Sequence, residues 1–504
     1  MGRKNAILKN NIHLQIIYRM KENKIELKQG INRREFLSLS ALGLASFTIL
    51  PSWSMQGVRI APSDRVVMGF IGLGRQCLGD FRSFSGAPGI QVAACSDVDT
   101  MKITRFQNTV GAWQEQMGMN KRCDGYENYE QLLERKDIDA VEACSPDHWH
   151  ALHTIHACQA GKDVYVQKPL SYTVVEALAM AEAARVNKRV VQTGSQQRSS
   201  GEFQKAIELV QNGTIGHIER IHARVGAPPT PYKLQEQPVP ANLNFNLWMG
   251  PLNDPRVHYH PDICPPISLN PVQNETLWGA WRWYLEMGNG YTADWGAHHF
   301  DIAQAAIGMD GSCPVEFIPQ GYRGARYNHM RYANGIIMSE EPYLEDNDSS
   351  RGIKFFGTKG WIEVARGYLA CSVPNVVPED LAGRRPAARD AAATPQAQQT
   401  QTQAAAAPAQ QTAQATAPRT TASPHMQNFI DCVRSRQKPI ATVEVGASTA
   451  ILCCNVNLAL ELGRPVKWDP ATYSYGDDKE ARNHRLFNYQ YRPPYSLPYS
   501  NSFV

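Results

Sequence analysis

The sequence predicts an α/β fold in which a doubly wound parallel sheet is followed by a second α/β region with an antiparallel sheet. Three observations support this prediction. An apolar strand enters a glycine-rich turn at residues 66–79, apolar strands then alternate with helical segments as far as residue 196, and residues 218–225 alternate with a period of two. Buried parallel strands, crossover helices and half-exposed antiparallel strands produce these patterns.

The glycine-rich turn is the most informative segment. The apolar run at residues 66–71 predicts a buried strand, residues 72–79 carry the turn, and a second strand at residues 90–95 ends near Asp97, 23 residues after Gly74. Glycines let backbone amides approach a pyrophosphate, a helix N-terminus favours its negative charge, and a carboxylate about 20 residues further on can bond the ribose hydroxyls. The pattern predicts a Rossmann domain that binds NAD, because an acid at this position repels the 2′-phosphate of NADP.

This match to the dinucleotide-binding pattern is incomplete. Cys77 stands at the third glycine position, which serves helix–strand packing and accepts a small residue. Tight turns use the same glycines, so the prediction depends on strand, turn, helix and acid occurring in register. The predicted cofactor contacts of this segment are Gly72, Gly74, Arg75, Gln76 and Asp97.

Further elements continue the doubly wound pattern. Strands are predicted at residues 140–144, 163–166 and 189–193, with helices at residues 151–160 and 174–187. We therefore expect the NAD-binding domain to span residues 64–197.

Residues 198–504 are expected to form a C-terminal domain for substrate binding and oligomerisation. Strands are predicted at residues 352–356 and 361–364, long binding loops at 226–283 and a helix at 448–462. Residues 391–418 contain only Ala, Thr, Pro and Gln, which cannot bury enough apolar surface to fold. A disordered insertion is expected at about residues 380–424, with a helical Ala/Gln segment as the less favoured interpretation.

The first 63 residues resemble an extension with an export signal. Residues 32–37 contain the pair Arg33-Arg34 of a twin-arginine motif, and residues 37–50 are uncharged, mostly apolar and short for a membrane span. The alternative is a basic turn before an ordinary core helix. We expect twin-arginine export to the periplasm, with retention at the inner membrane if the signal stays uncleaved and no stable membrane span after its removal.

Charge and cysteine usage exclude other classes. The net charge is +4, but the first 36 residues hold nine Lys and Arg and three Asp and Glu, so the remainder has 42 basic and 44 acidic residues. No basic face indicates a nucleic-acid partner. The 11 cysteines include no C-x-x-C pair, and most lie in apolar runs, so we expect core residues rather than disulfides or a metal site.

Two segments carry candidate chemistry. Lys168 follows the strand at residues 163–166, and ligands of such sheets bind beyond the carboxyl ends of the strands, although a solvated lysine is an equal alternative. Asp294 and His298 are four residues apart, so on a helix they share a face and can touch. A carboxylate beside an imidazole suits a general base. The alternatives are a capping Asp with a core His, or a metal site that includes Asp301.

Together these segments resemble the Gfo/Idh/MocA family of NAD(P)-dependent oxidoreductases, in particular its exported bacterial members. The resemblance covers about residues 65–497 apart from the Ala/Gln insertion, and the matching stretches are residues 72–79, 95–99, 145–150, 167–169, 194–198, 294–298, 463–469 and 491–495. It implies a Rossmann domain followed by an α/β domain on a large open, mainly antiparallel sheet that commonly mediates oligomerisation, here as a dimer or tetramer.

The resemblance also implies an activity: NAD(P)-dependent oxidation of a CH–OH group in a small sugar, glycoside or cyclitol. It implies catalytic roles for Lys168, Asp294 and His298, with Asp294 orienting His298, while Gln167 replaces the usual Glu of the family. The further implied cofactor contacts are Ser145, Asp147, His148, Trp149, His150, Gln167, Lys168 and Gln196. The candidate substrate contacts are Arg198, Tyr291 and His299.

Two other functions remain open at this point. The family contains exported N-acetylgalactosaminidases that use bound NAD transiently, oxidising C3 of a glycoside before elimination and hydration; those hydrolases lack the family lysine, whereas Lys168 is present here. The other alternative is a non-catalytic sugar-binding protein with structural NAD, which the presence of Lys168, Asp294 and His298 disfavours.

Overall fold

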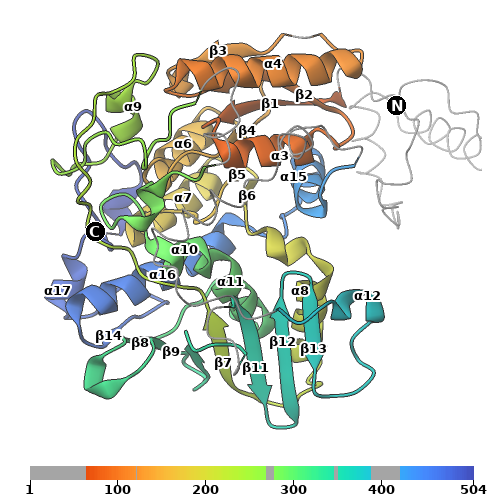
Figure 1. Cartoon of the computed structure of the whole chain (residues 1–504), viewed down its shortest axis with the longest axis vertical. Coiled ribbons are helices and arrows are strands. Elements are labelled where there is room, and N and C mark those ends of the chain that lie inside the picture. Colours follow the sequence, from red (N-terminus) through yellow and green to blue (C-terminus); the bar gives the residue numbers. More distant parts are fainter. Residues whose placement is uncertain (1–63, 121, 268–276, 345–349, 387–420, 504) are drawn as a thin grey trace, which may run out of the picture. The chain divides into compact units, whose positions relative to one another are not determined.

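The structure is a computed structural model that describes residues 64–120, 122–267, 277–344, 350–386 and 421–503. The predicted twin-arginine segment and residues 391–418 lie outside this part. A parallel sheet forms the first half of the structure. The sheet order is β3-β2-β1-β4-β5-β6 and every pairing is parallel (Figure 1). Its strands are β1 (Val66–Ile71), β2 (Ile90–Ser96), β3 (Asp124–Tyr126), β4 (Ala140–Ala143), β5 (Asp163–Val166) and β6 (Val191–Thr193).

The helices of this half follow the predicted alternation. They are α3 (Arg75–Phe84), α4 (Thr100–Gln116), α5 (Tyr129–Leu133), α6 (Asp147–Gln159) and α7 (Val174–Val186). Helix α6 begins four residues before the predicted start at residue 151, because Pro146 caps it and Asp147 occupies its first turn. Helix α15 (Pro424–Ser435), from far along the chain, packs against α3 and β1 (Figure 1).

The second half contains a mixed, mostly antiparallel sheet of eight strands in the order β13-β12-β11-β7-β10-β9-β8-β14. Only the β7–β10 pairing is parallel among those described. Its strands are β7 (Ile218–Arg224), β8 (Glu316–Ile318), β9 (His329–Arg331), β10 (Ile337–Ser339), β11 (Gly352–Gly357), β12 (Gly360–Ala365), β13 (Tyr368–Cys371) and β14 (Val466–Lys467).

Helices α8 (Gly201–Gln211), α11 (Gly296–Ala306) and α16 (Val443–Leu462) pack against this sheet. The remaining helical segments are short: α9 (Phe245–Met249), α10 (Gly290–Asp294), α12 (Glu379–Ala382), α17 (Lys479–Arg482) and the 3₁₀ turns at Gln196–Ser199, Ala280–Trp283, Tyr322–Gly324 and Ser500–Ser502. Helix α12 and the start of α15 fall inside the expected insertion at residues 380–424, so the ends of that segment are ordered where the structure describes them.

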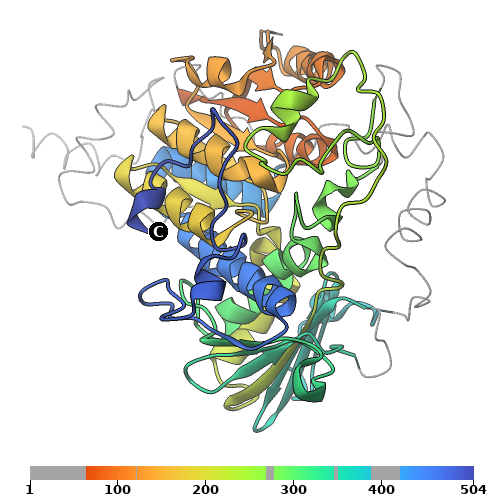
Figure 2. The same ribbon diagram turned by 90° about the vertical axis from the view of Figure 1, so that its left-hand side faces the viewer.

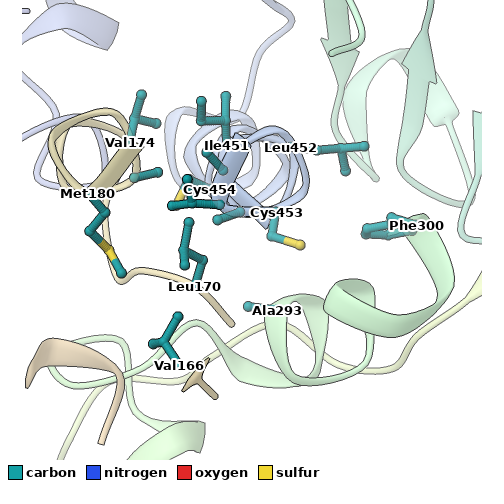
Figure 3. Close-up of a cluster of buried hydrophobic side chains, with 14 of the residues drawn as sticks. Val166, Leu170, Val174, Met180, Ala293, Phe300, Ile451, Leu452, Cys453 and Cys454 are labelled. Atoms are coloured by element: carbon teal, nitrogen blue, oxygen red, sulfur yellow. The ribbon is translucent and has the colours of Figure 1, made fainter. Parts of the chain in front are cut away.

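Helix α16 joins the two halves within the unit Val66–Val504. It contacts α7 and β6 on one side and α11 on the other, and Figure 2 shows it between the two sheets. In Figure 3 its residues Cys453 and Cys454 pack among Leu170, Val174 and Phe300. Gly446 permits the close approach to β6, because a Cβ there would lie 2.2 Å from Thr193 Oγ1.

The same helix corrects an expectation about membranes. By length and composition α16 could cross a bilayer, although the sequence analysis expected no such segment beyond the signal. Most of it is buried against protein, as in the core helix of a globular domain. The cysteines expected in the core are free thiols among the described residues, and most of them are buried.

The contribution of the aromatic cluster around Phe70 of β1 to stability can be tested by substitution. Phe70 is fully buried, and its ring centroid lies 5.2 Å from that of Phe106 and 6.0 Å from that of Phe81. We predict that Phe70→Ala lowers the free energy of unfolding by about 3–5 kcal/mol, because it removes these contacts and leaves a cavity. Urea unfolding measures the change. Met117→Ala, at a position 60% exposed, is the control and should change stability little.

Candidate active site

One cleft of about 650 Å³ runs from the glycine-rich turn of the parallel sheet to the helix pair α10–α11. It lies at the carboxyl ends of the parallel strands, where ligands of such sheets bind. Most of the predicted site residues line it: Gly72, Gly74, Arg75, Gln76, Asp97, Ser145, Asp147, Trp149, His150, Gln167, Lys168, Gln196, Tyr291, Asp294 and His298.

The glycine turn is held close to the β4–α6 loop. Gly72 has φ +83°, and a Cβ there would lie 2.7 Å from the backbone nitrogen of Ser145, so a side chain does not fit. Gly74 caps α3 without any capping side chain, and nothing lies within 4 Å of where its Cβ would be. The first turn of α3 is therefore open to an anionic ligand.

Asp97 ties the end of β2 to this turn. Its carboxylate accepts hydrogen bonds from the backbone nitrogens of Leu73 (2.7 Å) and Asp99 (2.9 Å). These contacts place a carboxylate in the cleft beside the glycine turn, as the sequence spacing predicted.

The segment after β4 divides between the cleft and the core. His150 lines the cleft and bonds the carbonyl oxygens of Pro169 (2.8 Å) and Ser145 (2.9 Å), which ties the loops after β4 and β5 together. His148 is fully buried, does not line the cleft and contacts the carbonyl oxygen of Trp248 at 3.0 Å. Burial raises the pKa of Asp147, in the first turn of α6, to about 8.

Lys168 and Asp294 form an ion pair at the far end of the cleft. The Nζ of Lys168 lies 2.5 Å from Oδ1 of Asp294 and 3.1 Å from its carbonyl oxygen. Burial alone would raise the pKa of Asp294, but the charge of Lys168 and then of Arg282 outweighs it and lowers the pKa. Asp294 is therefore an ionised partner for the ammonium group.

A polar network fixes helix α10, which carries Asp294. Asn289, at its N-cap, donates from Nδ2 to the carbonyl oxygen of Tyr172 at 2.8 Å. Asn457 of α16 donates to the carbonyl oxygen of Asn289 at 2.9 Å. Asp294 is thus anchored both to the loop after Lys168 and to the central helix.

His298 shares the cleft but not the predicted contact with Asp294. The helix is interrupted at Trp295, so Asp294 ends α10 and His298 lies in the first turn of α11. Asp294 accepts its hydrogen bond from Lys168 instead. His298 is 6% exposed, and its Nδ1 has no hydrogen-bond partner among the described residues. Burial, followed by the charge of Lys168, holds the pKa of His298 well below its ordinary value, so the imidazole is neutral at pH 7.

The sequence analysis missed the arginines of this part of the cleft, which are Arg282, Arg351 and Arg366. The guanidinium carbon of Arg351 lies 4.5 Å from the ring centroid of Tyr291 and 4.8 Å from that of Trp295, and that of Arg366 lies 4.7 Å from Trp295. Arg351 precedes β11 and Arg366 follows β12, so only the folded second sheet brings them to the cleft. No local motif marks them.

Two predicted substrate contacts point elsewhere. Arg198 is buried outside the cleft lining and binds both carboxylate oxygens of Asp301, at 2.6 and 2.8 Å, together with Asp310. His299 is fully buried, and its Nδ1 contacts the carbonyl oxygen of Arg224 at 2.8 Å. Because Asp301 is committed to Arg198, it does not join Asp294 and His298 in the metal site considered as an alternative.

A different group of potential metal ligands exists among the described residues, although the sequence analysis expected none. One ligand atom each from Asp80, Glu142 and Cys144 lies within 4.8 Å of the others, beneath the cleft. Burial raises the pKa of the Cys144 thiol, so the thiolate that a metal requires is disfavoured.

Comparison with known proteins identifies the parallel-sheet half. The profile of the Gfo/Idh/MocA oxidoreductase family, described as having an NAD-binding Rossmann fold, matches residues 66–195. Residues 66–195 belong to the Gfo/Idh/MocA oxidoreductase family. NAD is the cofactor of this Rossmann segment, and the open α3 N-terminus, the close approach at Gly72 and the carboxylate of Asp97 fit it.

Two curated relatives each match about a third of this chain. A myo-inositol 2-dehydrogenase from Thermotoga maritima is 31% identical over 32% of this chain and 46% of its own length. A glycosyl hydrolase family 109 protein from Shewanella pealeana is 29% identical over 37% of this chain and 44% of its own length. The matched region thus spans less than half of either relative.

A solved structure extends the likeness to the whole fold. Levoglucosan dehydrogenase, in a complex with NADH and levoglucosan, matches 80% of this chain and 99% of its own with a TM-score of 0.50 at 15% identity. At this identity the match supports the two-part Gfo/Idh/MocA architecture alone.

A substitution of Arg198 tests whether this residue stabilises the fold or binds the substrate. We predict that Arg198→Ala lowers the free energy of unfolding by about 3–5 kcal/mol, because the fully buried carboxylate of Asp301 loses its partner. NAD affinity should not change, since Arg198 does not line the cleft. Urea unfolding and fluorescence titration with NADH measure the two quantities. Normal stability combined with weaker substrate binding would instead assign Arg198 to the substrate.

Proposed function

We propose that the protein is an NAD-dependent oxidoreductase that oxidises a secondary hydroxyl group of a sugar, glycoside or cyclitol. The observation that supports this most is the meeting of Lys168, Asp294 and His298 in the cleft that begins at the glycine turn. The relatives of this chain, a myo-inositol 2-dehydrogenase among them, support a polyhydroxylated substrate.

Each residue has a defined part in this proposal. Bound NAD supplies the hydride acceptor. The neutral imidazole of His298 accepts the proton of the substrate hydroxyl, and the ammonium group of Lys168 donates a hydrogen bond to the same oxygen as negative charge develops there. Asp294 accepts a hydrogen bond from Lys168 at 2.5 Å and so positions its Nζ, rather than orienting His298 as the sequence suggested.

Replacing His298 or Lys168 should lower turnover without abolishing cofactor binding in the cleft. We predict that Lys168→Ala and His298→Ala each lower kcat by about 10²–10⁴-fold and leave NADH binding detectable. The acid limb of the wild-type kcat/KM profile should lie below the ordinary histidine pKa of about 6.5, since the lowered pKa of His298 keeps the base neutral to lower pH.

Steady-state assays on a panel of sugars and cyclitols, with NADH fluorescence titration, measure these effects. Lys205→Ala and His217→Ala, on the surface and outside the cleft lining, are the matched controls. Unchanged turnover in both cleft variants would contradict the assignment and favour a binding protein with structural NAD.

A second candidate function is glycoside hydrolysis with an NAD that is reduced and reoxidised within each cycle. The glycosyl hydrolase family 109 relatives favour it. The presence of Lys168 in the cleft beside His298 favours net oxidation. We predict that aryl glycosides give NADH and keto-sugar without release of the phenol. Absorbance of the phenol and of NADH, followed together, separates the two functions; phenol without net NADH supports hydrolysis.

We further propose that the protein acts in the periplasm after export by the twin-arginine route, on the basis of Arg33 and Arg34. We predict that the double change Arg33→Lys and Arg34→Lys retains the protein in the cytoplasm, whereas Arg19→Lys does not. Cell fractionation with immunoblotting measures the distribution. Equal export of the double variant and the wild type would contradict this route.

A further inference from the structure

A buried carboxylate lies directly beneath the cofactor cleft and is not part of the mechanism above. Asp80, on α3, is 2% exposed and accepts hydrogen bonds from the side-chain amides of three glutamines. The donors are Nε2 of Gln167 (2.5 Å), Gln76 (2.9 Å) and Gln196 (3.1 Å). The three glutamines come from α3 and from the ends of β5 and β6, and all of them line the cleft.

A second carboxyl group lies against Asp80. Glu142 stands in the middle of the parallel sheet, between Phe70 of β1 and Tyr165 of β5, and is fully buried. Its carboxyl group lies near that of Asp80 and near the thiol of Cys144, with one ligand atom of each within 4.8 Å of the others. None of the three glutamine amides that bond Asp80 bonds Glu142.

The two carboxyl groups differ in their partners. No Lys or Arg of the described chain lies within ion-pair distance of either carboxyl. Three side-chain amides donate to the oxygens of Asp80 and none donates to Glu142. Asp80 is therefore the group on which the amides of the cleft floor converge.

The hydrogen bonds to Asp80 fix how the glutamine amides are oriented in the cleft. An amide that points its nitrogen at Asp80 must point its oxygen away from it. For Gln167 that oxygen accepts a hydrogen bond from the backbone nitrogen of Lys168 at 3.2 Å. Asp80 thus acts through Gln167 on the residue that carries the catalytic ammonium group, and through Gln76 and Gln196 on the floor of the cleft.

We propose that Asp80 is a positioning residue of the NAD cleft, whose carboxyl oxygens orient the side-chain amides of Gln76, Gln167 and Gln196. This inference concerns NAD binding and does not depend on the identity of the oxidised substrate.

The test compares two changes that convert a carboxyl group to its amide. Asp80→Asn leaves the three amides one acceptor oxygen in place of two, so the dissociation constant for NADH should rise about tenfold or more. Glu142→Gln leaves all three amides and their acceptor in place, so the dissociation constant should stay within about threefold of the wild type. NADH fluorescence titration and calorimetry measure both, and the exposed Glu208→Gln is the matched control.

A second set of variants keeps the inference testable if Asp80→Asn fails to fold. Gln76→Ala and Gln196→Ala remove one amide each and leave Asp80 in place. Each should weaken NADH binding in the same titration, while Glu208→Gln should not.

Three results would overturn the inference. Asp80→Asn with wild-type NADH affinity would remove the positioning role. A loss of affinity in Glu142→Gln equal to that of Asp80→Asn would show that the amides of Asp80 are not what matters. A stoichiometric metal ion in the purified protein that is lost in Glu142→Gln would replace the positioning role with a cation bound by Asp80, Glu142 and Cys144.

Discussion

The ion pair between Lys168 and Asp294 is the contact on which the candidate site depends. Its partners are 126 residues apart in the chain, one after strand β5 and the other at the end of helix α10. A short, partly buried ion pair offsets the cost of removing its two charges from water only where the fold holds both side chains in good geometry. His150 secures the loop after β5, and Asn289 and Asn457 secure α10, so each partner is fixed by its own part of the fold.

The position of that pair follows from the burial of α16. A helix that is apolar on nearly all sides must be covered on all sides, and here α7 and β6 cover one side while α11 covers the other. The same helix therefore sets the separation between the parallel sheet and the mixed sheet. The cleft is the space left at the carboxyl edge of the first sheet, where α10 and α11 reach the glycine turn.

Charge compensation explains the polar groups around the cleft. Lys168 lowers the pKa of Asp294, and burial followed by Lys168 lowers that of His298, which makes one a stable counter-ion and the other a neutral base. Beneath the floor no Lys or Arg of the described chain pairs with Asp80, which accepts three amide hydrogen bonds instead. Outside the cleft Arg198, which the sequence had suggested for substrate binding, forms a buried ion pair with Asp301.

Local patterns determined much of this protein. Strand periodicity, the turn at Gly72 and Gly74, and the spacing to Asp97 predicted the parallel sheet and its NAD site, because these features depend on neighbouring residues and on the fixed geometry of a strand–turn–helix unit. The residue pattern also singled out Lys168, Asp294 and His298. Only the tertiary structure decided which of them pair. The helix is interrupted at Trp295, which separates Asp294 from His298, and the carboxylate of Asp294 bonds Lys168 instead. Arg351, Arg366, Asp80 and Glu142 carried no local signal, since their roles arise from charges and amides that distant segments bring together and that burial makes strong.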